Sequence, residues 1–300
     1  MDDADRGSAE GKGRLIAMSD HPWRHHFLPE WYLKHWARNG RVWAFSRPRG
    51  IGFPVVAKPY APRAIGFDEN LYTDPRENDP DKRVELETRF FKQVDDRAAR
   101  AFRLALANRP AEFADKVALV QFILGLLHRS PARIAFLERE LARRLEEDDA
   151  PVGFDAAWLR SSALKVLSDI STSDQSLALM AQMKVFVHAL GRGAHDLITS
   201  DKPALLSNGM EQSNAFILMP IGPTKLMALV HREGVARRFF DQKPRDLSRS
   251  INAALLAQAE GLVIGNRVSE LSFVEKHFLT GHDDEDSRGR LDGLMRWQLP

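Results

Sequence analysis

Apolar positions recur at helical spacing through the middle of the chain. The pattern predicts a helix over 84–108 and a second over 112–129 that is apolar nearly all round. A third helix over 132–148 carries a single apolar stripe, and residues 155–182 fit one or two more. We expect the second helix at the centre of the fold, because it offers no polar face to water.

After residue 183 the pattern changes to alternation, which is typical of strands. Short strand-like runs, separated by turns rich in Gly, Pro or Asn, occupy 184–190, 196–200, 215–219 and 225–230. Helical spacing then returns over about 246–261 and 269–279. Helices, a run of antiparallel strands and further helices predict an α+β fold, in which a helical half packs against a small, mainly antiparallel sheet.

The two ends of the chain read differently from its centre. Residues 1–19 are rich in Gly, Ser and charge without periodicity, so they are predicted to be a disordered lead-in. Residues 20–280 are predicted to form a single α+β domain, and 281–300 a polar tail. Within the domain, residues 46–83 hold six of the prolines and are expected to form a long irregular loop.

The composition of the chain excludes several kinds of functional site. The chain has no cysteine, which excludes disulfides, zinc–thiolate sites and a cysteine nucleophile. Its net charge of +2 does not indicate a nucleic-acid partner, although one stays open. The sequence shows no secretory signal and no apolar run long enough to span a bilayer, so no membrane partner and a cytoplasmic location are expected.

The segment from His25 to Trp36 is unusually dense in imidazoles and aromatic rings. In an extended chain His25 and His26 point to opposite faces, so at most one of them faces a given site. His26 is a candidate general base or metal ligand. The alternative is that its imidazole hydrogen-bonds the backbone behind it while the aromatic side chains pack.

Several short motifs follow one another in a fixed order. They are His26-Phe27-Leu28-Pro29-Glu30-Trp31-Tyr32-Leu33-Lys34-His35-Trp36, Asn70-Leu71-Tyr72-Thr73, Val94-Asp95, Arg129-Ser130-Pro131, Thr199 to Pro203, Pro220-Ile221-Gly222-Pro223 and Asn252. In this order the chain resembles the family called domain of unknown function 4238, over most of residues 24–265. The family has no known activity, so the resemblance implies no substrate, cofactor or catalytic residue. The positions matched by polar or amphipathic side chains are His26, Tyr32, Tyr72, Arg129, Asp201 and Asn252.

Carboxylates supply the remaining candidate chemistry. Asp201 follows a predicted strand, where a side chain can serve as ligand or base, but Asp before Lys-Pro also makes a good turn with its carboxylate on backbone N–H groups. Glu87 and Asp95 lie about two helical turns apart. Together with His26 and Asp201 they would suit a divalent metal, whose bound water could cleave a phosphodiester. Their ordinary role is a salt bridge, here with Arg129.

Two functions of different class therefore stand. The first is a hydrolase acting on a phosphate-containing or nucleic-acid substrate, with His26 and Asp201 as catalytic groups and Arg129 as an anion clamp. Tyr32, Tyr72 and Asn252 would line its binding site. The second is a non-enzymatic binding or sensing module that uses an aromatic surface around Trp31–Trp36. The enzyme requires that its polar residues converge in one cleft.

Overall fold

The computed structural model describes residues 24–50, 52–107, 109, 112–147, 154–207 and 209–278. The predicted lead-in over 1–19 and the predicted tail over 281–300 lie outside the described residues. The helices are α1 (Glu30–Leu33), α2 (Pro80–Arg83), α3 (Lys92–Leu106), α4 (Phe113–His128), α5 (Pro131–Glu147), α6 (Ala156–Ser171), α7 (Asp174–Ala181), α8 (Glu233–Phe240), α9 (Pro244–Gln258) and α10 (Leu271–His277). The strands are β1 (Arg24–His26), β2 (Val42–Ser46), β3 (Val56–Tyr60), β4 (Phe67–Glu69), β5 (Lys184–Ala189), β6 (Thr199–Ser200), β7 (Leu205–Leu206), β8 (Phe216–Pro220), β9 (Lys225–Val230) and β10 (Val263–Gly265).

A four-stranded antiparallel sheet of order β5-β9-β8-β7 separates two hydrophobic cores. Ile217 pairs with Leu229, and both side chains belong to the core under the helical layer. The next pair, Leu218 and Ala228, belongs to the core under α9. Successive side chains of a strand point to opposite faces, so a strand buried on both faces needs apolar residues at nearly every position. This requirement explains the nearly continuous apolar runs of β8 and β9.

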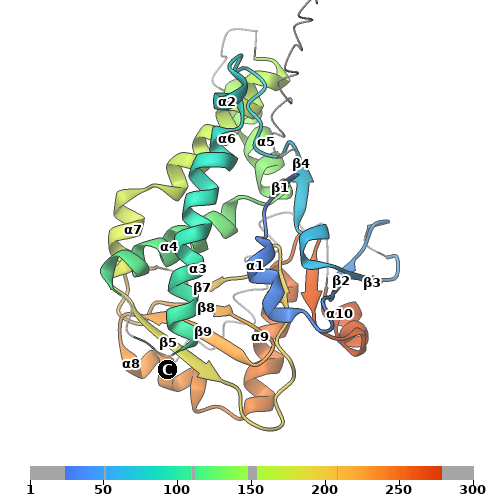
Figure 1. The fold of residues 1–300 in the computed structure, drawn as a ribbon, viewed down its shortest axis with the longest axis vertical. Helices are drawn as coiled ribbons and strands as arrows, with labels where there is room; N and C mark the ends of the chain where they lie inside the picture. Colours follow the sequence, from blue (N-terminus) through green and yellow to red (C-terminus); the bar gives the residue numbers. More distant parts are fainter. Residues whose placement is uncertain are drawn as a thin grey trace, which may run out of the picture.

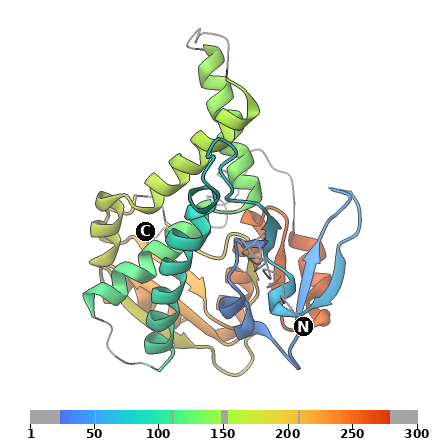
Figure 2. The same ribbon diagram turned by 45° about the horizontal axis from the view of Figure 1, so that its top comes forward.

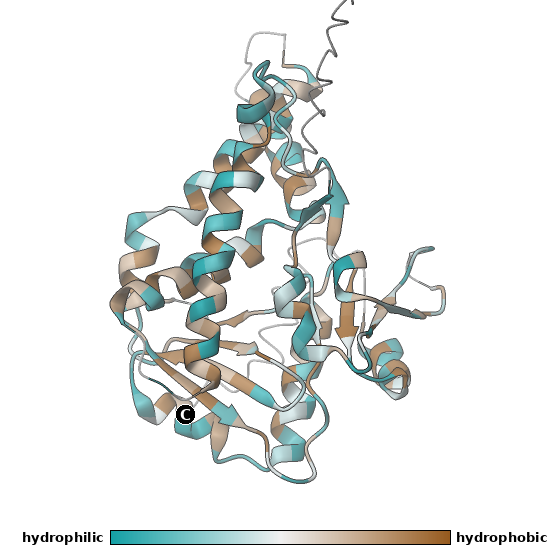
Figure 3. Ribbon diagram, in the orientation of Figure 1, coloured by the Kyte–Doolittle hydropathy of each residue, from teal (hydrophilic) through white to brown (hydrophobic). Residues whose placement is uncertain are grey.

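The helical layer is built around α4, which packs against α3, α6 and α7. Helices α3 and α4 lie on one side of the central sheet, and α8 and α9 lie on the other (Figure 1). Helices α5 and α6 pair and extend away from the sheets (Figure 2). Hydrophilic residues follow the outward face of α3, and apolar residues dominate the central strands (Figure 3). The helical part packed against antiparallel strands confirms the predicted α+β class.

The sheets are more numerous than predicted. A second sheet has the order β3-β2-β10-β6, and β1 pairs with β4 in a small third sheet. The expectation of an irregular loop over 46–83 was therefore wrong, because this segment supplies β3, β4 and α2. Strands of three to five residues that pair with distant segments leave almost no local signal. The single-domain prediction over 20–280 stays a prediction, favoured by the two cores that share one sheet.

The predicted helix over 84–108 is two pieces in the structure. A π-helical segment, η3 (Leu86–Phe91), precedes α3. Short 3-10 turns also occur at η1 (Lys34–Trp36), η2 (Pro62–Ala64) and η4 (Val268–Glu270). Among the helices of the described ranges, none combines the length and the apolar character that a membrane crossing requires.

Candidate functional site

Arg129 is a fully buried cation at the C-terminal end of α4. Its Nη1 donates to Asp95 Oδ1 at 3.0 Å, and its Nε donates to the Phe27 carbonyl at 2.9 Å. Its guanidinium carbon lies 5.3 Å from the ring centre of Phe91 and 5.5 Å from that of Phe122. A buried charge requires such compensation, because removal from water alone costs several kcal/mol. The predicted salt bridge between Asp95 and Arg129 is thus present.

Glu87 lies on η3 within electrostatic range of this ion pair. The pKa of Glu87 is raised to about 7. Burial is the largest cause, the positive charge of Arg129 opposes it, and the negative charge of Asp95 adds to it. A hydrogen bond with the backbone of His26 also lowers this pKa. The Oε2 atom of Glu87 and the Nη2 atom of Arg129 are buried without a hydrogen-bond partner in the described part of the chain. Glu87 is therefore a carboxyl group that exchanges its proton near neutral pH.

His26 lies on β1 at the edge of the same cluster. Its ring packs against Phe67 at 5.5 Å between ring centres, and its Nε2 is buried with no hydrogen-bond partner among the described residues. Burial lowers the pKa of His26, and the positive charges of Arg129 and Arg24 lower it further. The backbone of Arg63 and the charge of Glu30 oppose these effects. The imidazole is thus held in its neutral form at neutral pH.

His25 and Tyr72 form a structural pair on the opposite side of β1. The fully buried His25 accepts the backbone N–H of Tyr72 at Nδ1 (2.8 Å), and the two rings stack with centres 5.6 Å apart. The hydroxyl of Tyr72 donates to the carbonyl of Arg129 at 2.8 Å. Burial raises the pKa of Tyr72 well above its ordinary value. Tyr72 thus ties the loop after β4 to the end of α4, and its hydroxyl is already committed.

Asp201 does not join this cluster. Its Oδ1 accepts the backbone N–H of Glu260 at 3.0 Å, and its Oδ2 accepts those of Gly261 and Leu262 at 2.6 and 2.8 Å. Burial raises the pKa of Asp201 to about 6, while these hydrogen bonds oppose the rise. The alternative in which the carboxylate closes a turn on backbone N–H groups is the one observed. Asp201 holds the turn between α9 and β10 against the end of β6.

The aromatic segment after His26 is core rather than surface. Tyr32, Leu33 and Trp36 are fully buried, so the expected aromatic recognition surface around Trp31–Trp36 is absent. The hydroxyl of Tyr32 lies 2.8 Å from Thr199 Oγ1 and donates to the Pro220 carbonyl at 3.0 Å. Amphipathic rings bury their apolar bodies and satisfy their polar ends on nearby groups, which explains this outcome.

Trp36 and Asn252 continue the same pattern of internal ties. Trp36 donates from Nε1 to the Leu197 carbonyl at 2.7 Å. Asn252, nearly fully buried on α9, accepts the backbone N–H of Ile198 at 3.0 Å and donates to the Asp196 carbonyl at 2.9 Å. Both side chains fix the segment that leads into β6.

The predicted residues thus divide into two groups. The structure brings His26, Glu87, Asp95 and Arg129 together, and we call these four residues the Arg129 centre. Tyr32, Asp201 and Asn252 lie elsewhere and hold segments of the fold together, whereas Tyr72 borders the centre through the hydrogen bond from its hydroxyl to the Arg129 carbonyl. In the described ranges, no three His, Asp or Glu side chains gather closely enough to hold a metal ion, so the candidate ligands His26, Glu87, Asp95 and Asp201 do not form a metal site there.

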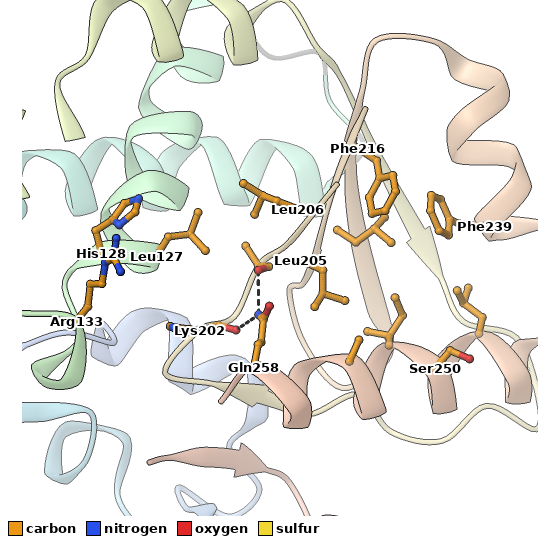
Figure 4. Close-up of a pocket in the computed structure, with 15 residues that line it drawn as sticks. Leu127, His128, Arg133, Lys202, Leu205, Leu206, Phe216, Phe239, Ser250 and Gln258 are labelled. Atoms are coloured by element: carbon orange, nitrogen blue, oxygen red, sulfur yellow. Dashed lines mark hydrogen bonds between the residues drawn. The ribbon is translucent and has the colours of Figure 1, made fainter. Parts of the chain in front are cut away.

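A cavity that the sequence did not reveal lies on the other side of Asp201. It has a volume of about 360 Å³ and opens between the end of α4, the strands β7 and β8, and helix α9 (Figure 4). We call it the α9 pocket. Its lining is Leu127, His128, Arg133, Lys202, Ala204, Leu205, Leu206, Phe216, Leu218, Phe239, Leu247, Ser250, Ile251, Ala254 and Gln258.

The ionisable side chains of the α9 pocket gather at one end. His128, Arg133 and Lys202 gather there, whereas Phe216 and Phe239 lie at the opposite end (Figure 4). Burial, and then the positive charges of Arg133 and Lys202, lower the pKa of His128 to about 4. The Nδ1 atom of His128 is buried without a hydrogen-bond partner in the described part of the chain.

The floor of the α9 pocket is rigidly held. Gln258 donates from Nε2 to the carbonyls of Lys202 and Ala204 at 2.5 and 3.0 Å. The ammonium of Lys202 pairs with Glu260 at 2.5 Å, and the same carboxylate accepts the hydroxyl of Ser130 at 2.6 Å. No motif marks this pocket in the sequence, because its apolar residues have the spacing of ordinary core positions. The one available signal was Lys202, inside the motif from Thr199 to Pro203.

Comparison with known proteins identifies the family to which the chain belongs. No curated protein and no solved structure matches the chain. A family model described as "protein of unknown function (DUF4238)" matches residues 24–269. This range contains the Arg129 centre and every residue that lines the α9 pocket. The chain therefore belongs to the DUF4238 family of proteins of unknown function.

Proposed function

We propose that this chain is a non-enzymatic binding module that holds a small, largely apolar molecule in the α9 pocket. The observation that carries the proposal is the cavity itself. Its volume of about 360 Å³ falls in the range of small-molecule sites, and its lining is mostly aliphatic and aromatic with a few polar groups at one end. Ligand sites usually have this arrangement, whereas an unfilled cavity of this kind in a protein core costs stability.

The surroundings of the α9 pocket support a binding role. Two family motifs meet beside it, since Ser130 follows Arg129 and bonds to Glu260, and Lys202 follows Asp201 and pairs with the same carboxylate. The motif residues thereby fix one wall of the cavity before any ligand arrives. Pre-organisation of this kind lowers the cost of binding, because little has to be ordered on association. The cytoplasmic location of the module stays a prediction.

A neutral fluorescent probe tests the proposal. N-phenyl-1-naphthylamine should bind saturably to the full chain, and octan-1-ol should displace it. Ala254 lines the pocket from α9, so Ala254→Trp should fill the cavity and weaken probe binding at least about tenfold, a loss of ~1.4 kcal/mol. Ala253→Trp is the matched control, because this half-buried neighbour on α9 does not line the pocket.

Each outcome of this titration decides the proposal. Saturable binding that Ala254→Trp weakens and Ala253→Trp leaves unchanged supports it. Absence of saturable binding to the wild-type chain, or equal weakening by both variants, rejects the α9 pocket as the binding site. Thermal unfolding of both variants shows whether each is folded at the temperature of the titration.

We also propose, as a second candidate, a hydrolase acting on a phosphate-containing or nucleic-acid substrate at the Arg129 centre. The specific observation in its favour is Glu87, whose pKa of about 7 suits an acid–base group at neutral pH. The unpartnered Nη2 of Arg129 offers a donor for an anion beside it. In this version His26 and Glu87 act on the substrate, and Asp201 has no part because three backbone N–H groups occupy its oxygens.

Turnover assays separate the second candidate from the first. A hydrolase should release nitrophenol from p-nitrophenyl phosphate or its diester, or cleave single-stranded oligonucleotides. Glu87→Gln should then reduce turnover about 100-fold, the usual contribution of an acid–base group. Glu85→Gln, which changes an exposed neighbour paired with Arg89 at the surface, should keep the wild-type rate. Wild-type protein without turnover on any of these substrates would remove the hydrolase.

A further inference from the structure

The two ends of the α9 pocket differ in chemistry, which restricts what it can hold. One end is closed by the rings of Phe216 and Phe239 (Figure 4). The other end carries His128, Arg133 and Lys202, three side chains that are cationic or able to donate a hydrogen bond. A molecule that fills this cavity must place an apolar body between strands and helix and a polar group at the His128 end.

Building on the proposed binding function, we infer that the occupant is an amphipathic monoanion: a medium-length aliphatic or aromatic body that ends in one carboxylate. The body lies against Leu218, Phe216 and the apolar face of α9. The carboxylate lies at the end formed by His128, Arg133 and Lys202. Medium-chain fatty acids and arylalkanoic acids share this chemistry.

The charges at the polar end favour an anion over a cation or a neutral head group. Arg133 and Lys202 are positive, and Lys202 pairs with the carboxylate of Glu260, which also accepts the hydroxyl of Ser130. The pKa of His128 is lowered to about 4, first by burial and then by the charges of Arg133 and Lys202. Its imidazole thus lies in a positive potential that repels a further cation and attracts an anion.

Two of these side chains suit a carboxylate. The Nδ1 atom of His128 is buried and has no hydrogen-bond partner in the described part of the chain. In the neutral imidazole this nitrogen can carry the proton and donate it to an anion. The guanidinium of Arg133 stacks on Phe136 with its carbon 4.5 Å from the ring centre, which fixes the plane of its fork. A planar carboxylate matches such a fork better than a hydroxyl does.

Competition between matched ligands tests this inference without any variant. Octanoate and octane-1-sulfonate should displace the neutral probe from the full chain at concentrations at least about tenfold lower than octan-1-ol. Octylamine, protonated at pH 7, should bind more weakly than octan-1-ol. Octane-1-sulfonate, octylamine and octan-1-ol share one octyl chain, and the alkyl chain of octanoate is one methylene shorter, so the comparison isolates the head group.

A charge-removing variant locates the head group. Arg133→Met keeps the apolar stem, and it should weaken octanoate about tenfold while octan-1-ol binding stays unchanged. Arg139→Met, on the exposed side of the same helix, should change neither affinity. If Arg133→Met is poorly folded, Lys202→Met answers the same question from the other wall.

The failures are distinguishable. If the neutral probe and octan-1-ol do not bind at all, the proposed binding function fails and the inference fails with it. If octanoate and octan-1-ol bind equally, the α9 pocket is a ligand site but the anion inference is wrong. If Arg133→Met weakens both ligands equally, Arg133 shapes the pocket rather than recognising a charge, and the inference is again rejected.

Discussion

The Arg129 centre and the α9 pocket are neighbours of opposite design. In the Arg129 centre a buried cation meets a carboxylate, a backbone carbonyl and two ring faces, which together compensate its charge. The α9 pocket instead leaves about 360 Å³ unfilled among mostly apolar side chains. The motif residues therefore describe how the fold is held together, and the cavity beside them is where we propose that a ligand binds.

Removal of the buried cation should have the largest effect. Arg129→Met leaves Asp95 as an uncompensated carboxylate with 17% of its side chain exposed, so it should destabilise the fold by about 3–5 kcal/mol. Chemical denaturation of the variant measures this loss. Arg139→Met, an exposed substitution, serves as the control and should stay within about 0.5 kcal/mol of wild type. A similarly small loss for Arg129→Met would show that the Arg129 centre is not a structural joint.

The next effect is a dependence of stability on pH that comes from Glu87. Its pKa is about 7 in the fold against an ordinary value of 4.5, so between these pH values the folded state binds a proton that the unfolded chain has released. The contribution of the protonated Glu87 to the stability is fully present below about pH 4.5 and is lost as the pH rises through about 7. The groups that face this carboxyl are Arg129, Asp95 and the backbone of His26.

Glu87→Gln isolates this contribution. The variant should gain on the order of 2 kcal/mol relative to wild type between pH 5 and pH 8, because its side chain is never charged. Urea unfolding at the two pH values measures the difference, and Glu85→Gln controls for a surface carboxylate. Parallel stability curves for wild type and Glu87→Gln would contradict the raised pKa of Glu87.

The internal ties of the aromatic segment predict a moderate effect. Tyr32→Phe removes the hydroxyl that bonds Thr199 and Pro220, and leaves a buried carbonyl without its donor. The expected loss of stability is about 1–2 kcal/mol. Tyr60→Phe, on the edge strand β3, is the matched control and should be close to neutral. Equal stability of both variants would indicate that the Tyr32 hydroxyl does not hold β6 against β8.

The smallest effect on stability is expected in the α9 pocket. It gives the clearest contrast with the Arg129 centre. Arg133→Met should cost less than about 1 kcal/mol, because the side chain is only half-buried. The same variant should lose octanoate binding. A loss of stability as large as that of Arg129→Met would show that Arg133 stabilises the fold as Arg129 does. It would contradict the distinction between the structural Arg129 centre and the α9 pocket.

Much of the fold could be predicted because some segments carry their own signal. Helix α4 is apolar on all sides, and strands β8 and β9 are buried on both faces, so periodicity located them to within about two residues. Strands β1, β4 and β10 have three residues each and pair with distant partners. Only the assembled tertiary structure defines them.

The candidate sites show the same limit. The pairing of Asp95 with Arg129 and the turn made by Asp201 followed from the ordinary chemistry of those residues, and the structure shows both. The convergence of His26 with Glu87 depends on β1 lying beside η3, which no local pattern specifies. The α9 pocket depends on how α9 crosses β7 and β8. Its lining residues run from Leu127 to Gln258 in the sequence, and only the folded chain brings them together.

A residue-resolved NMR titration of the full chain with octanoate tests the division between the two regions most directly. We predict saturable shifts at methyl groups of Leu205, Leu218 and Ala254, which line the α9 pocket, and none at the backbone amides of Glu87 and Asp95. The largest shifts at the Arg129 centre, or no saturable shift at all, would contradict the account.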